Sequence, residues 1–209
     1  MKKEDGSLGY KAVSEEFPRK HKGVVVSMAI ADTGKFIMTA SDDTNVIIWD
    51  LKGDVLASIT TNQDGTWRLW DTDVEYKKQQ DPYLLRTVPC QVSDGSRIAL
   101  SPDARAVAVS SGRDIFLYSA SSGDLEEEFH NVHSENITDL KFDINNRFLV
   151  SSGDRAVRVF HNVTGYRAAI ADMQALLKKS NNAGVKQRLQ QQITEAQAAL
   201  NAITDKQKS

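Results

Sequence analysis

The sequence predicts a mainly β protein that is assembled from repeated strand units and ends in a pair of helices. A tight turn followed by a short alternating strand and an aromatic residue recurs along residues 21–165. Two of these aromatic residues, Tyr118 and Phe160, lie 42 residues apart, which is the length expected of a four-stranded repeat. After residue 165 the apolar spacing changes from a period of two to a helical period.

The composition is that of a globular protein, with 40% hydrophobic and 26% charged residues in a chain of 209. The formal net charge of −2 argues against a protein whose main partner is nucleic acid, because such proteins are usually strongly basic. A single cysteine, Cys90, excludes an internal disulfide. The longest nearly apolar run, residues 24–31, is far shorter than the roughly 20 residues of a spanning helix. Neither a transmembrane helix nor a signal peptide is therefore predicted.

The first complete repeat begins at His21. Residues 1–20 precede it and are predicted to be the end of an earlier repeat plus a linker, with 10–13 as a lone outer strand. Turn residues then separate four apolar or alternating stretches that we expect to be strands, at 24–31, 35–41, 45–49 and 55–60.

A later repeat follows the same plan with different residues. It extends 27 residues from His133 to Phe160, and the first repeat extends 28 residues from His21 to Trp49. In both, an aspartate in the last turn stands six residues before the aromatic residue. Agreement at three positions predicts that both segments form the same unit. A weaker copy lies between them, with strands expected at 97–100, 106–110 and 114–118.

The recurring histidine, aspartate and aromatic residues resemble the WD-repeat family of β-propellers. The resemblance covers about residues 10–165 and implies that residues 21–165 form a propeller segment. Closed propellers need about four to eight blades. Because the chain supplies three recognisable units and one partial unit, we expect an incomplete WD-repeat β-propeller of about three to four blades, followed by a C-terminal α-helical hairpin.

In this family a histidine, a serine or threonine, an aspartate and a tryptophan form a buried hydrogen-bonded chain that joins the strands of a blade. The resemblance implies this structural role for the matching residues of the first repeat, which are His21, Ser41, Asp43 and Trp49. The matching residues of the last repeat are His133, Ser152 and Asp154. Phe160 stands at the tryptophan position and has no N–H. The hydrogen-bonded chain of the last repeat therefore lacks the bond that a tryptophan would make. Repetition explains these residues without a substrate, and a structural role is favoured over a catalytic Ser-His-Asp arrangement.

The stretch from Asp64 to Trp70 matches the third strand of a repeat but arrives too early. Trp70 lies only 21 residues after Trp49. A full repeat period would need at least about 20 further residues, or about 60 if another blade is also absent. We therefore expect an internal deletion near Gln63 and Asp64, and an open inner edge on the strand that ends at Trp70, prone to associate with other chains.

Residues 166–209 are predicted to form a helical tail. Ile170, Met173 and Leu177 fall on one face of a first helix at about 167–179, and Asn182 is a candidate cap for a second helix. The second helix carries a seam of under three heptads, formed by Val185, Leu189, Ile193, Ala196, Leu200 and Ile203. A hairpin, or packing on the propeller, is favoured over a dimer zipper.

No catalytic, cofactor or metal site is predicted. His130 and His133 could offer two metal ligands, but no cysteine stands nearby at zinc-site spacing. Gly34-Lys35 lacks the other residues of a phosphate-binding loop. No activated nucleophile or cofactor loop is evident, so we expect a protein that is not an enzyme.

The stretches FIMTASDDTNVIIWDLKG and QRLQQQITEAQAAL resemble one particular member of the WD-repeat family. This resemblance implies an adaptor for protein partners that is anchored in the endoplasmic reticulum membrane, with its propeller on the cytosolic face. The partners that it implies are a stress-sensing kinase, the ribosome and messenger RNA. The hydrophobic anchor of that relative is absent here, which would leave the chain cytoplasmic.

Two alternatives to a protein-binding adaptor stay open. The tail from Arg167 onward carries seven Lys or Arg residues against three acids, and Lys77-Lys78 adds to this charge, which favours contact with RNA or the ribosome. A solvated helix face explains the same charges. The other alternative is a truncated product without an independent function.

Overall fold

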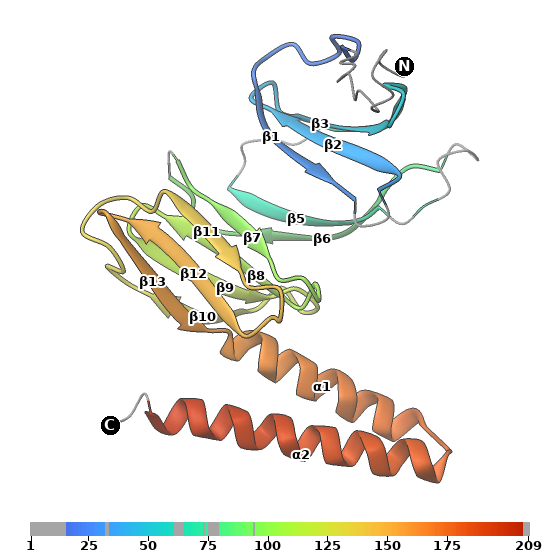
Figure 1. Ribbon diagram of the computed structural model, residues 1–209, viewed down its shortest axis with the longest axis vertical. Coiled ribbons are helices and arrows are strands. Elements are labelled where there is room, and N and C mark those ends of the chain that lie inside the picture. Colours follow the sequence, from blue (N-terminus) through green and yellow to red (C-terminus); the bar gives the residue numbers. More distant parts are fainter. Residues whose placement is uncertain are drawn as a thin grey trace, which may run out of the picture. The chain divides into compact units, whose positions relative to one another are not determined.

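The computed structural model describes residues 16–31, 34–60, 65–72, 74, 80–93 and 95–206 (Figure 1). The strands form four sheets, and two helices follow them toward the C-terminus. The chain consists of two compact units. The first comprises Met1–Asp64 and Trp70–Tyr83, and the second comprises Gly65–Leu69 and Leu84–Ser209.

The first unit contains one four-stranded antiparallel sheet. Its strands, paired in sequence order, are β1 (Val25–Ile30), β2 (Phe36–Ser41), β3 (Asn45–Asp50) and β4 (Val55–Thr60). Two turns need a left-handed backbone, at Thr44 with φ 67° and at Gly53 with φ 90°. A Cβ atom at Gly53 would also lie 3.1 Å from the Phe17 ring, so both the backbone angle and the lack of space favour glycine at this position.

The two faces of β3 are buried against different partners. Ile48 is fully buried and packs with Ala57 and Ile59 on one face. Trp49 points to the other face, where its ring centroid lies 5.5 Å from that of Phe17. The β-branched run before Trp49 suits such a strand, because branched side chains pack well on a pleated surface.

Strand β1 differs from the others of this sheet because all six of its residues are exposed. Four apolar side chains on and next to it, those of Val24, Val26, Met28 and Ile30, are between 62% and 67% exposed. A strand with one covered face would bury every second residue. The first unit therefore leaves both faces of β1 open.

Strands β5 (Thr66–Asp71) and β6 (Tyr83–Pro89) form a two-stranded sheet. The two tryptophans of β5 pack in different units: Trp70 packs with the Ile48 cluster of the first unit, and Trp67 packs with Val88 and Tyr118 in the second. The strand predicted to end at Trp70 is thus present, whereas Asp64 lies outside the described residues.

The second unit contains two further blades. The first has four strands, which are β7 (Ile98–Leu100), β8 (Ala106–Ser111), β9 (Asp114–Ser119) and β10 (Leu125–Phe129). The second has three, which are β11 (Asp139–Phe142), β12 (Phe148–Gly153) and β13 (Ala156–His161). Ala108, Ile115 and Leu117 of the four-stranded blade are fully buried with Leu149 of the other, and these contacts form the core between the two blades.

The fold class predicted from the sequence is confirmed. The chain is mainly β, and its described sheets do not close into a ring, which is the arrangement of an incomplete propeller. Strand β10 had no counterpart among the predicted strands. Its Leu-Glu-Glu-Glu-Phe sequence contains three consecutive glutamates, which are depleted in strands and hide the alternation.

The tail forms a helical hairpin of α1 (Val163–Lys179) and α2 (Ala183–Lys206), which lie side by side in Figure 1. Val163, Ile170, Ile193 and Leu200 form its buried core. Helix α1 begins four residues before the predicted start, because Asn162 caps it directly after β13: its side chain accepts a hydrogen bond from the Gly165 N–H.

Helix α1 is attached to the blades by polar contacts. The Arg105 guanidinium of the four-stranded blade binds Asp172 with an Nε–Oδ2 distance of 2.8 Å. The Thr164 hydroxyl donates to Glu127 of β10 at 2.9 Å. The hairpin therefore both closes on itself and packs on the propeller segment, two arrangements that the sequence analysis had left open as alternatives.

We expect the double change Ile193→Lys and Leu200→Lys to separate α2 from α1. Both side chains are about 8% exposed, and helices of this length in water depend on packing of their apolar face. Backbone hydrogen exchange over 185–203 should accelerate by at least about tenfold. The matched control is Gln192→Lys on the exposed side of the same helix. Equal protection in all three proteins would show that this seam does not hold the helix.

Candidate functional site

The last blade contains a buried polar network centred on His133. This histidine lies in the loop between β10 and β11, and its side chain is fully buried. Its Nδ1 is 2.7 Å from Asp154 Oδ1, and its Nε2 is 2.9 Å from Ser151 Oγ. Because a carboxylate can only accept, Nδ1 carries the proton of the first bond. The loop, β12 and the β12–β13 turn are thus joined through one imidazole ring.

Arg158 is a fourth member of this network that the sequence analysis did not single out. Its Nη1 donates to Asp154 Oδ1 at 3.1 Å and contacts the ring of His133. The spacing of four residues between Asp154 and Arg158 indicates an ion pair only in a helix, so in this turn and strand it gave no usable signal. Arg158 adds a charged donor to the Asp154 carboxylate. It does not replace the N–H that Phe160 lacks, because in the first blade the Trp49 N–H donates to the Thr39 hydroxyl and not to the carboxylate.

Phe160 itself packs in an apolar environment. Its ring centroid is 4.8 Å from that of Phe129 in β10, and it lies against the core around Leu149. The tryptophan position of the last blade has therefore become part of the apolar contact between blades.

The first blade contains a related network with a tryptophan. Trp49 Nε1–H donates to Thr39 Oγ1 at 2.8 Å, and His21 Nε2 lies 2.7 Å from the same hydroxyl. His21 Nδ1 is 3.5 Å from Asp43 Oδ2, compared with 2.7 Å in the last blade. The imidazole is therefore held more loosely by its carboxylate in the first blade than in the last.

The structure corrects the two serines assigned to these networks. The hydroxyl that contacts the histidine belongs to Thr39, not Ser41, and to Ser151, not Ser152. Ser41 instead accepts a hydrogen bond from the Asp43 N–H, and Ser152 shares one with Thr138.

Strand register explains which hydroxyls lie beside the histidines. Trp49 pairs with Ile37, and Phe160 pairs with Leu149, so the hydroxyl two residues further along shares the face of the aromatic residue. Ser152 is one residue away from that position and faces the opposite side of its sheet. The hydroxyl that contacts the histidine stands four residues before the aspartate in the first blade and three in the last, where the turn is one residue shorter, whereas the sequence analysis placed it two residues before the aspartate in both.

The pKa of each aspartate is held well below its usual range. For Asp154 the main cause is the hydrogen bond from His133, followed by the Ser134 N–H at 2.7 Å. For Asp43 burial opposes the shift, but backbone N–H groups outweigh it, those of Lys22 at 2.6 Å and Asn45 at 2.9 Å. Both carboxylates are thus stabilised in their charged form by groups of their own blade.

The low pKa of Asp154 predicts an acid-sensitive last blade. A carboxylate whose folded pKa is depressed stabilises the fold above its unfolded pKa of about 4, and this contribution is lost as the pH falls below that value. Between pH 5 and pH 3 the free energy of unfolding should therefore fall more steeply for the wild type than for Asp154→Asn. Urea denaturation at both pH values measures this. Parallel losses in the two proteins would contradict the prediction.

One known family matches the sequence of the two blades that contain these networks. The family described as "WD domain, G-beta repeat" matches residues 15–50 and 126–161, which contain both histidine networks. The chain is a WD-repeat protein. The two matched segments include the residues from which the resemblance was first inferred, His21 to Trp49 and His133 to Phe160.

Comparisons with individual proteins extend the similarity to nearly the whole chain. It is 42% identical to Transducin beta-like protein 2 from Mus musculus over 280 residues, and 42% identical to the Homo sapiens protein over 275 residues. Each comparison covers 97% of this chain and 62% of the relative, so the chain spans less than two thirds of the length of these proteins. The β-propeller domain of Cps50 (Swd1) from Myceliophteria thermophila has a similar fold, with a TM-score of 0.55 and 13% identity, over 67% of this chain and 54% of that domain.

The comparison with the mouse protein extends over 71 more positions than this chain has residues, 280 against 209. Some positions of the relative therefore have no counterpart here. This fits the internal deletion predicted near Gln63 and Asp64, which stays a prediction because both residues lie outside the described part of the chain.

WD repeats together with this similarity support a protein-interaction scaffold, and WD-repeat blades are typically not catalytic. Among the residues described by the structure, no helix is both long and apolar enough to cross a membrane. The described histidines and acids also form no cluster of three or more groups able to hold a metal ion.

Proposed function

We propose that this WD-repeat chain is a non-enzymatic scaffold that binds protein partners through its blade surfaces. The observation that carries the proposal is the exposed apolar stretch of Val24, Val26, Met28 and Ile30 along β1. Contiguous exposed apolar surface on a folded protein marks contact with another macromolecule. A small polar substrate would gain little from such a surface, whereas a protein partner can bury it.

The polar networks support a scaffold in a different way. His133, Ser151 and Asp154 resemble the residue types of a catalytic triad, but each bonds within its own blade and the imidazole is fully buried. A general base must reach the proton that it removes. These residues join strands, and the scaffold needs no further role for them.

We further propose that the partner is a stress-sensing kinase of the endoplasmic reticulum and that the chain acts in stress signalling and translational control at the cytosolic face of that membrane. The support is the resemblance to Transducin beta-like protein 2. Cytoplasmic placement is the alternative, and the ribosome is a second candidate partner.

The test is direct binding of the purified chain to the cytosolic domain of such a kinase, measured by isothermal titration calorimetry. We expect a Kd in the micromolar range or tighter, and a loss of at least about tenfold in the double variant Met28→Lys and Ile30→Lys. The control is Leu51→Lys, an exposed apolar residue in a turn of the same blade. No binding by the wild type would overturn the kinase as partner. Equal binding by all variants would overturn β1 as the surface.

Contact with RNA or the ribosome through the basic tail is the second candidate function. Five basic residues of the tail lie on its two helices: Arg167, Lys178 and Lys179 on α1, and Lys186 and Arg188 on α2. Binding to RNA phosphates should weaken steeply with salt, whereas binding of a protein to the apolar β1 surface should not. If the chain binds neither partner class, the remaining alternative is a truncated product without independent function.

A further inference from the structure

The turn between α1 and α2 concentrates positive charge. Lys178 and Lys179 end α1, and Lys186 and Arg188 lie in the first two turns of α2. No Asp or Glu occurs between Asp172 and Glu195, although acids slightly outnumber bases in the whole chain. We call residues 176–190 the hairpin tip, and its formal charge is four positive with no negative residue.

These charges are free to meet a partner. All four cationic side chains are exposed. The ion pairs of the described residues involve Arg105, Arg167 and others, but none involves a cation of the hairpin tip. A solvated helix face usually carries acids among its bases, and that mixture is missing here.

Helix stability does not account for all of the charge. Lys178 and Lys179 suit the negative end of the α1 dipole. Lys186 lies near the start of α2, where the dipole is positive, and the first turn of that helix contains no acid to compensate. The basic residues of α2 are therefore placed where they weaken the helix slightly and enhance attraction for an anion.

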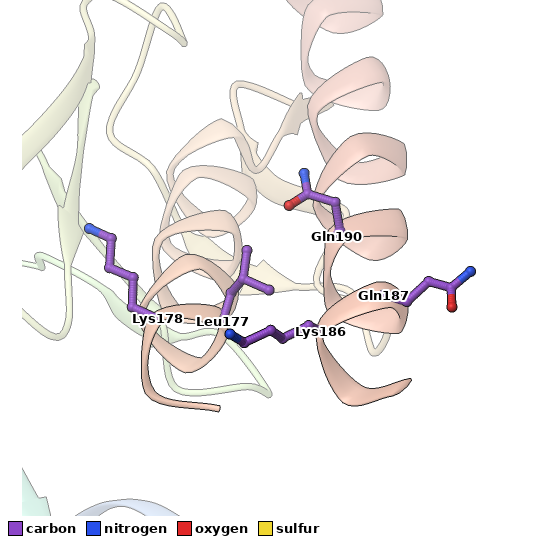
Figure 2. A pocket seen from close by; sticks show the side chains of 5 residues that line it. All are labelled: Leu177, Lys178, Lys186, Gln187 and Gln190. Carbon is purple, nitrogen blue, oxygen red and sulfur yellow. The ribbon is translucent and has the colours of Figure 1, made fainter. Parts of the chain in front are cut away.

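Apolar side chains accompany the cations at the hairpin tip. Leu176 is 56% exposed and Val185 is 46% exposed, whereas Val163, Ile170, Ile193 and Leu200 of the same two helices form the buried hairpin core. Figure 2 shows a shallow hollow between the helix ends, lined by Leu177, Lys178, Lys186, Gln187 and Gln190. Lys186 reaches across from α2 toward Leu177 of α1, so apolar surface and positive charge meet in one place.

We infer that the hairpin tip binds the surface of a membrane containing anionic lipids. Cations attract the negatively charged headgroups, and exposed aliphatic side chains between them can enter the boundary with the acyl chains. An acidic surface supplies many charges in a plane, which suits four cations spread over two helix ends. This contact is peripheral and does not depend on which protein the blades bind.

The composition of the hairpin tip favours lipid over RNA. Residues 173–194 contain no Phe, Tyr, Trp or His on which a base could stack, and three of the four cations are lysines. Single-stranded RNA is usually held by aromatic stacking in addition to phosphate contacts. Exposed Leu176 and Val185 would gain nothing from a phosphate backbone, but they gain from an acyl boundary.

Co-sedimentation of the full chain with lipid vesicles tests the inference. Vesicles of phosphatidylcholine are compared with vesicles that also contain about a third phosphatidylserine, at about 0.1 M salt. The wild type should bind the anionic vesicles at least about tenfold more strongly, because each cation near such a surface contributes a several-fold gain. Raising the salt to 0.5 M should remove most of this difference.

Two variants separate the parts of the hairpin tip. The first replaces Lys178, Lys179, Lys186 and Arg188 by Gln and should lose at least about tenfold in binding. The second carries Leu176→Ser with Val185→Ser, keeps all charges, and should lose about three- to tenfold in binding.

A matched control replaces four exposed lysines of the first unit, Lys20, Lys22, Lys35 and Lys52, by Gln. It changes the net charge equally and should bind as the wild type does.

Three results would overturn the inference. Equal binding by the wild type and the charge-neutralised variant would remove the hairpin tip as the site. Equal binding to neutral and anionic vesicles would remove the headgroup charge as the ligand. Binding of a single-stranded RNA probe that depends on the same four cations, without vesicle binding, would assign the site to RNA. Far-ultraviolet circular dichroism of every variant shows that the hairpin is still folded.

Discussion

Replacing His133 by alanine is expected to lower the free energy of unfolding by about 3–5 kcal/mol, the largest effect of any single change in the chain. The imidazole is fully buried and bonds to both Asp154 and Ser151. Its removal leaves a carboxylate without its main partner, a buried hydroxyl without its acceptor, and a cavity between them. Urea denaturation followed by tryptophan fluorescence and circular dichroism measures the loss.

Ser152→Ala is the matched control for His133→Ala. It lies in the same strand next to Ser151, but its hydroxyl bonds to Thr138 and not to the histidine. We expect a loss of at most about 1 kcal/mol, the usual contribution of one exposed hydrogen bond. If the two variants unfold at the same denaturant concentration, the network around His133 does not stabilise the blade.

Asn162→Ala is expected to lower the free energy of unfolding by about 2–3 kcal/mol and to loosen the hairpin. Asn162 is fully buried at the junction of β13 and α1. Its Oδ1 accepts from the Gly165 N–H at 2.9 Å, and its Nδ2 donates to the Asn146 carbonyl at 3.0 Å. A lost cap costs about 1 kcal/mol, and a partly buried carbonyl left unpaired adds a similar amount. Hydrogen exchange in the first turn of α1 should accelerate.

The control for this change is Asn182→Ala at the start of α2. Asn182 Oδ1 accepts from the Val185 N–H at 3.2 Å, so it is a cap of the same residue type, but it is exposed. Water can replace its bond, and we expect a loss below about 1 kcal/mol. Equal losses in the two variants would contradict a special role for the buried cap.

The sequence predicted the blades well because their signals are local and repeated. The alternation of β3, its Asp-containing turn and the terminal Trp49 identify a strand without reference to any distant residue. The hairpin seam was also readable, since Ile193 and Leu200 fall on the buried face. Val185 belongs to the same sequence pattern yet is 46% exposed and is not among the residues packed in the hairpin core.

The network members could not all be read from the sequence because they depend on register. Whether Ser151 or Ser152 meets His133 is decided by which residue of β13 stands opposite, and a turn shorter by one residue changes the answer. Arg158 was missed for a related reason. It occupies the position of Ile47 in the first blade, where an apolar residue is expected from the alternation.

The buried cap at Asn162 also determines how far the opposite end of α1 moves when the helix tilts at its base. Helix α1 has 17 residues and therefore rises about 26 Å from this junction to the turn. A rod of that length acts as a lever, and a tilt of about ten degrees at its base moves the far end by about 4–5 Å. Small repacking around one asparagine is thus amplified into a displacement of atomic-contact size at the opposite end. A load applied at the hairpin tip is transmitted in turn to β13 and, through the Asp172–Arg105 ion pair, to the four-stranded blade.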